Sequence, residues 1–139
     1  MAEVLLVDDN PADIDLISEL LVSGAALSHI NFVVNGIEAI SFLRRQGNYG
    51  EAVRPALVLL DLNLPRKDGR AVLAEIKADP VLRQIPIVIF STSQAPSDIA
   101  RSYELGANCY VTKPGNLTEF TSSVKSIQEF WLGVAMLPQ

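Results

Sequence analysis

The chain has 139 residues, a formal net charge of −5 and hydrophobic residues at 49% of its positions. This length suits one domain with a buried core, and the composition excludes a disordered chain. The acidic balance argues against nucleic-acid binding, which uses a basic face, and the single cysteine excludes an internal disulfide.

The first segment, MAEVLLVDDNPAD, contains a short apolar run with no basic residues before it. Such a run is too short for a signal peptide or a membrane span. The low cysteine usage indicates a reducing compartment. We therefore expect a cytoplasmic protein that binds neither nucleic acid nor membrane.

Five apolar runs of strand length recur along the chain, separated by segments with the apolar spacing of helices. In chain order, strands are expected at residues 3–7, 30–34, 56–61, 86–91 and 109–112. Helices are expected at residues 10–24, 35–47, 68–79, 95–106 and 116–134. The first helix is expected to have Asn10 as its N-cap and Pro11 at its first helical position, and to end at Gly24.

Strand and helix alternate five times, which predicts the α/β class, a doubly wound parallel sheet of five strands with helices on both faces. The sequence shows no linker and no repeat, so we expect a single domain over residues 1–139, with a core at 3–132 and an apolar tail at 133–139. In such a sheet the ligand site lies beyond the carboxyl ends of the strands, where the strand order reverses.

Polar side chains stand at the expected carboxyl ends of four strands: Asp8, Asp9, Asp61, Ser91, Thr92 and Lys113. Two carboxylates about 5 Å apart repel by about 3 kcal/mol at an effective dielectric near 20. Three carboxylates with one lysine keep a net negative charge. A hard dication with oxygen ligands complements such a cluster, and Mg²⁺ suits an open, partly hydrated carboxylate site.

Each of these residues has an ordinary explanation when it is taken alone. Aspartates at strand ends form turns and cap helices, and a serine there forms similar turns. A single lysine is usually a solvated surface residue. The joint arrangement at one edge of the sheet is what favours a functional site.

Four motifs resemble the signatures of a response-regulator receiver domain: VDDN at 7–10, LLDLNLPRKDG at 59–69, FSTS at 90–93 and YVTKP at 110–114. The resemblance covers residues 3 to about 132 and implies a flavodoxin-like or CheY-like sheet with the strand order 2-1-3-4-5. The stretches DLNLPRKDGR and RSYELGANCYVTKP look most like the small receivers that work with bacterial phytochromes and related sensor kinases.

The resemblance implies a chemical role for each residue of the cluster. Asp61 would be the phosphoacceptor. Asp8 and Asp9 would hold Mg²⁺ together with Asp61 and the backbone carbonyl of Asn63. Lys113 would pair with the phosphoryl oxygens, and its peptide bond to the following proline would be cis.

The resemblance also implies a switch. Ser91 lies 22 residues before Lys113 and takes the position of the switch hydroxyl, with Thr92 as the alternative. Tyr110 takes the position of the switch aromatic. Mg²⁺ and Lys113 would stabilise the phosphoryl oxygens during transfer, after which Ser91 would bond the acyl phosphate and Tyr110 would turn inward.

The last expected helix carries an apolar stripe with steps of three and four residues: Leu117, Phe120, Val124, Ile127, Trp131 and Val134. A helix that faces the core accounts for this stripe. It does not account for the further apolar residues Phe130, Leu132, Met136 and Leu137. We therefore expect the tail to meet a second copy or a partner, through the face formed by the fourth helix, the fifth strand and the fifth helix.

The sequence favours a stand-alone response regulator that accepts a phosphoryl group from a sensor histidine kinase. A phytochrome is among the candidate kinases. We expect no enzymatic activity toward other substrates. A Mg²⁺-dependent aspartyl-phosphate hydrolase is an alternative. It would require a general acid two residues after the nucleophile, where this chain has Asn63, and a cap domain.

Two further alternatives remain. A flavodoxin-like mononucleotide binder would require a phosphate-binding loop after the first strand, where DDNPAD offers repulsive carboxylates. A degenerate receiver that is not phosphorylated would be expected to lack one of the required residues, and all of them are present.

Overall fold

The computed structural model describes residues 2–23 and 28–138. One parallel sheet lies at its centre, with the strand order β2-β1-β3-β4-β5. The strands are β1 (Ala2–Val7), β2 (Ser28–Val33), β3 (Leu57–Leu60), β4 (Ile87–Ser91) and β5 (Cys109–Thr112). The predicted fold class and strand order are therefore confirmed.

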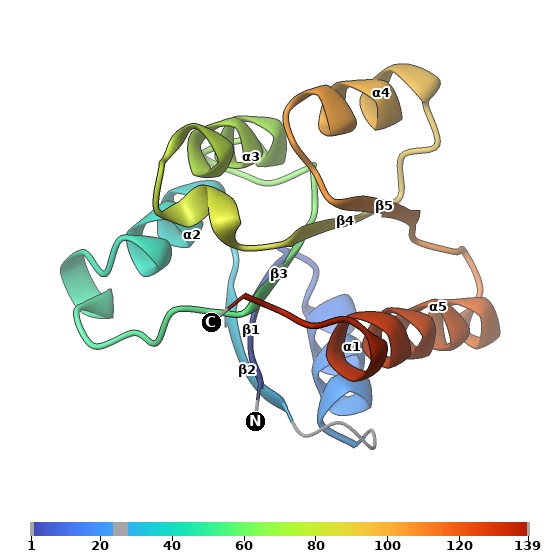
Figure 1. The fold of residues 1–139 in the computed structure, drawn as a ribbon. Helices are drawn as coiled ribbons and strands as arrows, with labels where there is room; N and C mark the ends of the chain where they lie inside the picture. Colours follow the sequence, from blue (N-terminus) through green and yellow to red (C-terminus); the bar gives the residue numbers. More distant parts are fainter. Residues whose placement is uncertain (1, 24–27, 139) are drawn as a thin grey trace.

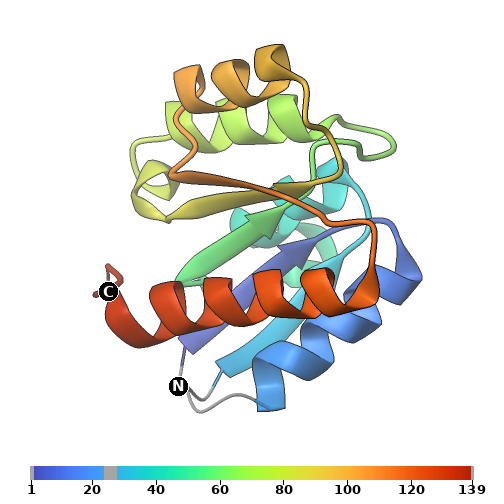
Figure 2. The same cartoon turned by 90° about the vertical axis from the view of Figure 1, so that its right-hand side faces the viewer.

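Five helices cover the two faces of this sheet (Figures 1 and 2). Helices α1 (Pro11–Ser23) and α5 (Leu117–Glu129) lie side by side on one face. Helices α2 (Gly36–Leu43), α3 (Gly69–Ala78) and α4 (Pro96–Glu104) cover the other. Within the part of the chain that the structure describes, no helix is long and apolar enough to cross a bilayer.

The helix starts follow the capping residues in the sequence. The side-chain oxygen of Asn10 accepts hydrogen bonds from the backbone N–H groups of Ala12 and Asp13, as predicted from its place before a helical proline. Asn35 and Asn116 cap α2 and α5 in the same way. The expected end of the first helix, Gly24, lies outside the described residues.

Short helical turns lie outside the predicted elements. One 3-10 turn lies at Gly47–Tyr49, between α2 and β3, and a second one lies at Leu82–Gln84, between α3 and β4. The last helix was expected to run to residue 134. The α-helix ends at Glu129 instead, and a π-helical turn continues it over Phe130–Val134.

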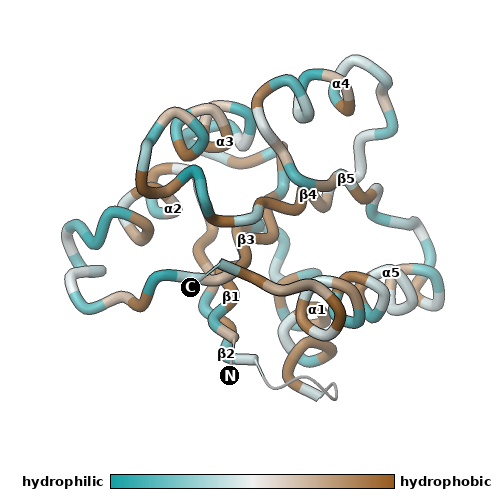
Figure 3. The backbone as a smooth tube through the Cα atoms, viewed as in Figure 1, coloured by the Kyte–Doolittle hydropathy of each residue, from teal (hydrophilic) through white to brown (hydrophobic). Residues whose placement is uncertain are grey.

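The central strands β1, β3 and β4 carry apolar runs, at residues 4–7, 57–60 and 87–90, because both faces of the sheet are covered there. The edge strand β2 is mixed and includes the exposed His29. One core cluster joins alternate strand residues such as Leu5 and Val58 to helices α2 and α3. The other joins Val4 and Leu59 to helices α1 and α5. Figure 3 shows this pattern as hydrophobic colour along the central strands. Polar side chains are left for the strand ends, where the chain leaves the sheet.

Candidate functional site

The pairing of β1 with β3 brings the predicted carboxylates together. Val7 is in register with Leu60, so Asp8 and Asp61 are the first residues beyond two adjacent strands. Asp8, Asp9 and Asp61 each offer an oxygen, and these oxygens all lie within 4.8 Å of one another. The acidic cluster predicted from the strand ends is therefore present.

Lys113 enters the cluster from the end of β5. Its Nζ donates to Asp8 Oδ2 at 2.7 Å and to Asp61 Oδ2 at 2.9 Å. Its side chain is only 3% exposed. The backbone N–H of Lys113 also donates to the carbonyl of Ser91 at 2.7 Å, which fixes the start of this side chain at the sheet edge. Lys113 is thus a buried counter-ion of the carboxylates.

A fourth carboxylate, Asp13 in the first turn of α1, also binds this lysine. Lys113 Nζ donates to Asp13 Oδ2 at 2.9 Å. Sequence reasoning placed Asp13 in the first turn of this helix but missed the contact, because it took only residues at strand ends as candidates for the site. The available signal was the N-cap at Asn10, which fixes where α1 begins and thus places its first turn beside the strand end.

Burial and pairing act in opposite directions on the charges of this cluster. Burial raises the pKa of Asp8, and hydrogen bonds from Lys113 and from the backbone of Asn10 offset part of that rise. Burial lowers the pKa of Lys113, but its hydrogen bonds with Asp61 and Asp8 outweigh this and leave the pKa raised. Lys113 is therefore a fixed positive charge beside the carboxyl groups of the cluster.

The oxygen donors of the cluster suit a hard divalent cation. In Asp8 and Asp61, the carboxylate oxygen that does not bind Lys113 accepts a hydrogen bond from the backbone. Asp8 Oδ1 accepts from the N–H of Asn10, and Asp61 Oδ1 accepts from the N–H of Asn63. Asp9 is exposed. Asn63, whose carbonyl was predicted as a further ligand, belongs to the same turn as Asp61. These residues fit the predicted metal.

The two hydroxyl candidates differ in burial. Ser91 is fully buried at the end of β4, and its Oγ accepts from the backbone N–H of Ser93 at 3.5 Å. Thr92 is exposed. Ser91 is thus the enclosed hydroxyl at the end of β4, whereas Thr92 lines the groove described below. The functional role of either hydroxyl stays a prediction.

Tyr110 already lies inward in this structure. It is half-buried and packs against the core cluster on the α2 and α3 side of the sheet. Its hydroxyl donates to the carbonyl of Ser93 at 2.9 Å. The Ser93 hydroxyl donates in turn to Asp98 in α4 at 2.6 Å, and Asp98 pairs with Arg70 of α3 at 2.8 Å. Sequence reasoning did not foresee this chain of polar contacts.

One expectation about the backbone is wrong. The peptide bond between Lys113 and Pro114 is trans, as are all peptide bonds in the described residues. Because the difference in free energy between cis and trans is only about 0.5–1 kcal/mol for bonds to proline, local packing decides the isomer and a sequence motif does not.

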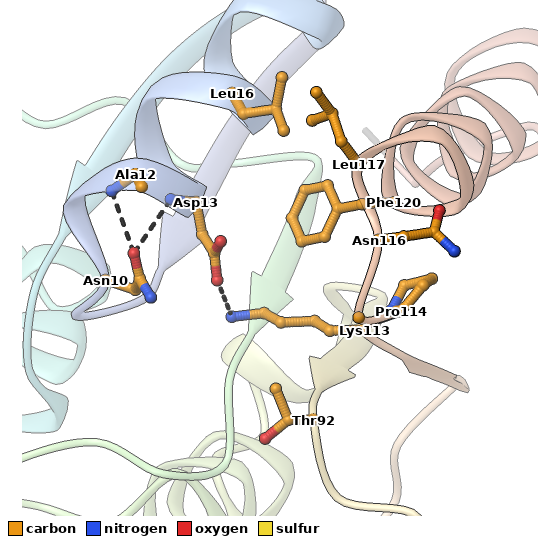
Figure 4. Close-up of a pocket in the computed structure, with 11 residues that line it drawn as sticks. Asn10, Ala12, Asp13, Leu16, Thr92, Lys113, Pro114, Asn116, Leu117 and Phe120 are labelled. Carbon is orange, nitrogen blue, oxygen red and sulfur yellow. Dashed lines mark hydrogen bonds and ion pairs between the residues drawn. The ribbon is translucent and has the colours of Figure 1, made fainter.

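A groove of about 410 Å³ opens beside the cluster, between α1 and the loop that leads from β5 to α5 (Figure 4). Leu16, Leu117 and Phe120 form its apolar wall. Asp13 and Lys113 point toward one another at its edge. The groove thus extends from an apolar surface to Lys113, whose ammonium donates a hydrogen bond to Asp61.

The sequence pattern of the response regulator receiver domain family matches residues 4–125. "Response regulator Rcp1" from Synechocystis sp. is 46% identical over 97% of this chain and 92% of its own length. The crystal structure of the Mn²⁺-bound form of Rcp1 is similar to this chain with a TM-score of 0.97 and 45% identity, and the match covers 100% of both chains.

Two further solved structures are similar to this chain. The phosphorylated cyanobacterial phytochrome response regulator RcpA has a TM-score of 0.96 and 51% identity over 99% of both chains. The receiver domain of the Pseudomonas aeruginosa sensor histidine kinase PA1611, with a magnesium ion in its active-site cleft, has a TM-score of 0.75 and 29% identity, over 95% of this chain and 98% of that one. The chain described here belongs to the response regulator receiver domain family.

Proposed function

We propose that this chain is a stand-alone response regulator that accepts a phosphoryl group on Asp61 from a sensor histidine kinase. The observation that carries the proposal is the ammonium of Lys113, which binds both Asp8 and Asp61 beside three clustered carboxylate oxygens. This combination provides a nucleophile, a fixed positive charge and oxygen ligands for Mg²⁺ at one point.

The residues of the site divide the work of the transfer. An oxygen of Asp61 forms a bond to phosphorus while the bond from phosphorus to the imidazole nitrogen of the donor breaks, and the electron pair of that bond goes to the nitrogen. Lys113 stabilises the phosphoryl oxygens from one side. Asp8, Asp9 and the carbonyl of Asn63 would hold Mg²⁺, which supplies positive charge for the same oxygens when it is bound.

The phosphorylated form signals through a change of surface. The hydroxyl of Ser91 moves to bond the new phosphoryl group, and the loop after β4 moves with it. Because Tyr110 is bonded to this loop at Ser93, the movement reaches β5 and α4. The output surface is therefore the face formed by α4, β5 and α5.

The same face, together with the apolar tail, supports the proposal of a homodimer. Phe130, Val134 and Met136 are 51%, 72% and 96% exposed. Leu137 in the same tail packs against the core, so the exposed apolar groups are held at the surface near the end of α5. The proposal also includes a single domain over residues 1–139, a cytoplasmic location and no activity on other substrates.

The kinase proposed as donor is of the phytochrome type, since the similar structure of RcpA is named as a phytochrome response regulator. We propose that the phosphohistidine domain of this kinase docks in the groove beside Lys113. The exposed Leu117, 67% accessible at the start of α5, lies on the wall of this groove.

Phosphotransfer from an autophosphorylated phytochrome-type kinase tests this function. We expect the label to move to the wild-type chain and not to Asp61→Asn. Leu117→Asp should slow transfer from the kinase at least tenfold and leave phosphorylation by a small phosphodonor unchanged, because the groove and not the chemistry is altered. Val81→Asp, at a site 60% exposed and outside the groove, is the control. Equal transfer to Leu117→Asp would contradict groove docking.

A further inference from the structure

The ammonium of Lys113 has no free hydrogen in this structure. An ammonium group carries three N–H donors, and those of Lys113 go to Asp8, Asp61 and Asp13 at 2.7, 2.9 and 2.9 Å. The proposed transfer requires one of these hydrogens for a phosphoryl oxygen. The lysine must therefore release at least one carboxylate during the reaction.

The three carboxylates are not equivalent. Asp8 and Asp61 belong to the oxygen cluster that fits a metal, and they are 2% and 10% exposed. Asp13 is 24% exposed and is not one of the three clustered carboxylates. A cation at the cluster therefore competes with Lys113 for Asp8 and Asp61 but not for Asp13.

Asp13 is also held independently of the cluster. Its backbone N–H donates to the side chain of Asn10 at 3.2 Å, and α1 packs against β2 and α5 through its buried residues. The position of the Asp13 carboxylate is therefore set by the start of α1. A fixed carboxylate of this kind can hold an ammonium in place while its other partners change.

We propose that Asp13 is the positioning residue for Lys113, which keeps one hydrogen bond to the ammonium throughout phosphorylation while the hydrogens shared with Asp8 and Asp61 become available to the phosphoryl group. This inference rests on the proposed function of Asp61. It assigns to α1 a part in the chemistry, because the first turn of the helix fixes the direction from which Lys113 approaches the phosphoryl oxygens.

The test uses Asp13→Asn, which preserves the shape of the side chain and removes its charge. Asp13→Glu restores a carboxylate. The matched control is Asp15→Asn, which removes one negative charge from an exposed position of the same helix. Each full-length variant is treated with acetyl phosphate over a range of Mg²⁺ concentrations, and the rate of phosphorylation is followed by intact mass.

At saturating Mg²⁺ we expect the rate for Asp13→Asn to fall about tenfold. Without the Asp13 carboxylate the ammonium of Lys113 is misplaced and loses its hydrogen bond to the phosphoryl oxygens in the transition state, and a hydrogen bond of this charged kind is worth about one power of ten. Asp13→Glu should recover part of this loss, and Asp15→Asn should stay within about twofold of wild type because screening weakens distant exposed charges. A mere loss of negative charge would instead change the Mg²⁺ concentration needed for half-maximal rate and leave the saturated rate intact, which would overturn the proposal.

A second readout follows the lysine itself. The ammonium of Lys113 is buried and fully bonded, so its protons should exchange slowly and give a distinct nuclear magnetic resonance signal. We expect this signal to be lost or to exchange at least tenfold faster in Asp13→Asn but not in Asp15→Asn. An unchanged signal would overturn the positioning role. A wild-type chain that is never phosphorylated would overturn the proposed function itself, even if the lysine signal behaved as expected.

Discussion

The hydroxyl of Tyr110 donates a hydrogen bond to the backbone carbonyl of Ser93 across 2.9 Å. This bond ties the only aromatic residue of β5 to the loop that follows the buried hydroxyl of Ser91. Because the Ser93 side chain also donates to Asp98 at 2.6 Å, one loop carries contacts to β5 and to α4. A displacement of this loop therefore alters two elements of the proposed output face at once.

Removal of this bond gives the first prediction. Tyr110→Phe retains the packed ring and should lower the free energy of unfolding by about 1 kcal/mol, the usual net contribution of one hydrogen bond. Urea denaturation measures the change. Tyr103→Phe is the comparison, since the Tyr103 hydroxyl accepts from the backbone N–H of Tyr110 but is half-exposed and replaceable by water. An equal or larger loss in Tyr103→Phe would contradict the account.

Asp98 gives a prediction about pH. Hydrogen bonds from Ser93 and then Arg70 lower the pKa of this carboxyl group, so its ionised form stabilises the folded chain. That contribution is present above the unfolded pKa, about 3.9, and is lost as the pH falls through the lower folded value. Wild type should be more stable than Asp98→Asn at pH 7, and the difference should shrink below pH 4.

The measurement is the free energy of unfolding of both proteins at several pH values. Asp68→Asn is the control, since Asp68 also pairs with Arg70 but does not contact the loop after β4. A difference between wild type and Asp98→Asn that stayed constant down to pH 3 would show that the charge of Asp98 does not stabilise this network.

Gly69 gives a prediction about the backbone behind the phosphoacceptor. A Cβ at this position would lie 2.2 Å from the carbonyl oxygen of Asp61 and 2.6 Å from the Cα of Leu62. Gly69→Ala should therefore cost about 3 kcal/mol of stability, at the upper end of overpacking effects, and should slow phosphorylation of Asp61. Thermal unfolding and intact mass measure the two effects. Gly50→Ala, where a Cβ meets open space, should change neither, and equal effects at both sites would contradict the prediction.

The tail gives a prediction about assembly. Val134 and Met136 are largely exposed, so replacing both with serine should leave the stability of the monomer unchanged and weaken self-association at least tenfold. Sedimentation velocity over a range of concentrations, with and without beryllofluoride as a phosphoryl mimic, measures this. The paired control replaces Val53 and Val81, also exposed, with serine. A wild-type chain that stays monomeric under all conditions would contradict the proposed dimer.

The sheet could be predicted from the sequence because its strands are continuous apolar runs that end abruptly in polar residues. The same contrast located Asp8, Asp61 and Lys113, since parallel strands bring their carboxyl ends to one edge. Residue type and position at the strand ends gave an acidic site suited to a dication, and the resemblance to receiver domains gave the strand order and the class of site. No long-range contact had to be known in advance.

Other features depend on tertiary placement and could not be predicted in this way. The contact of Asp13 with Lys113 joins residues 100 positions apart. The Asp98–Arg70 pair joins the first turns of α4 and α3, whose distance the sequence does not give. The π-helical turn after Glu129 interrupts a helical apolar pattern that looks continuous in the sequence. The trans bond before Pro114 likewise depends on local packing.

The central claim is that Asp61 is a phosphoacceptor that requires a divalent cation held by its neighbours. The most direct test is the intact mass of the chain after incubation with a small phosphodonor, with and without Mg²⁺, for wild type, Asp61→Asn and the control Asp68→Asn. We predict a single phosphoryl adduct in wild type and in Asp68→Asn that requires Mg²⁺, and no adduct in Asp61→Asn. An adduct that persists in Asp61→Asn, or no adduct in wild type under conditions that label another receiver, would contradict the account.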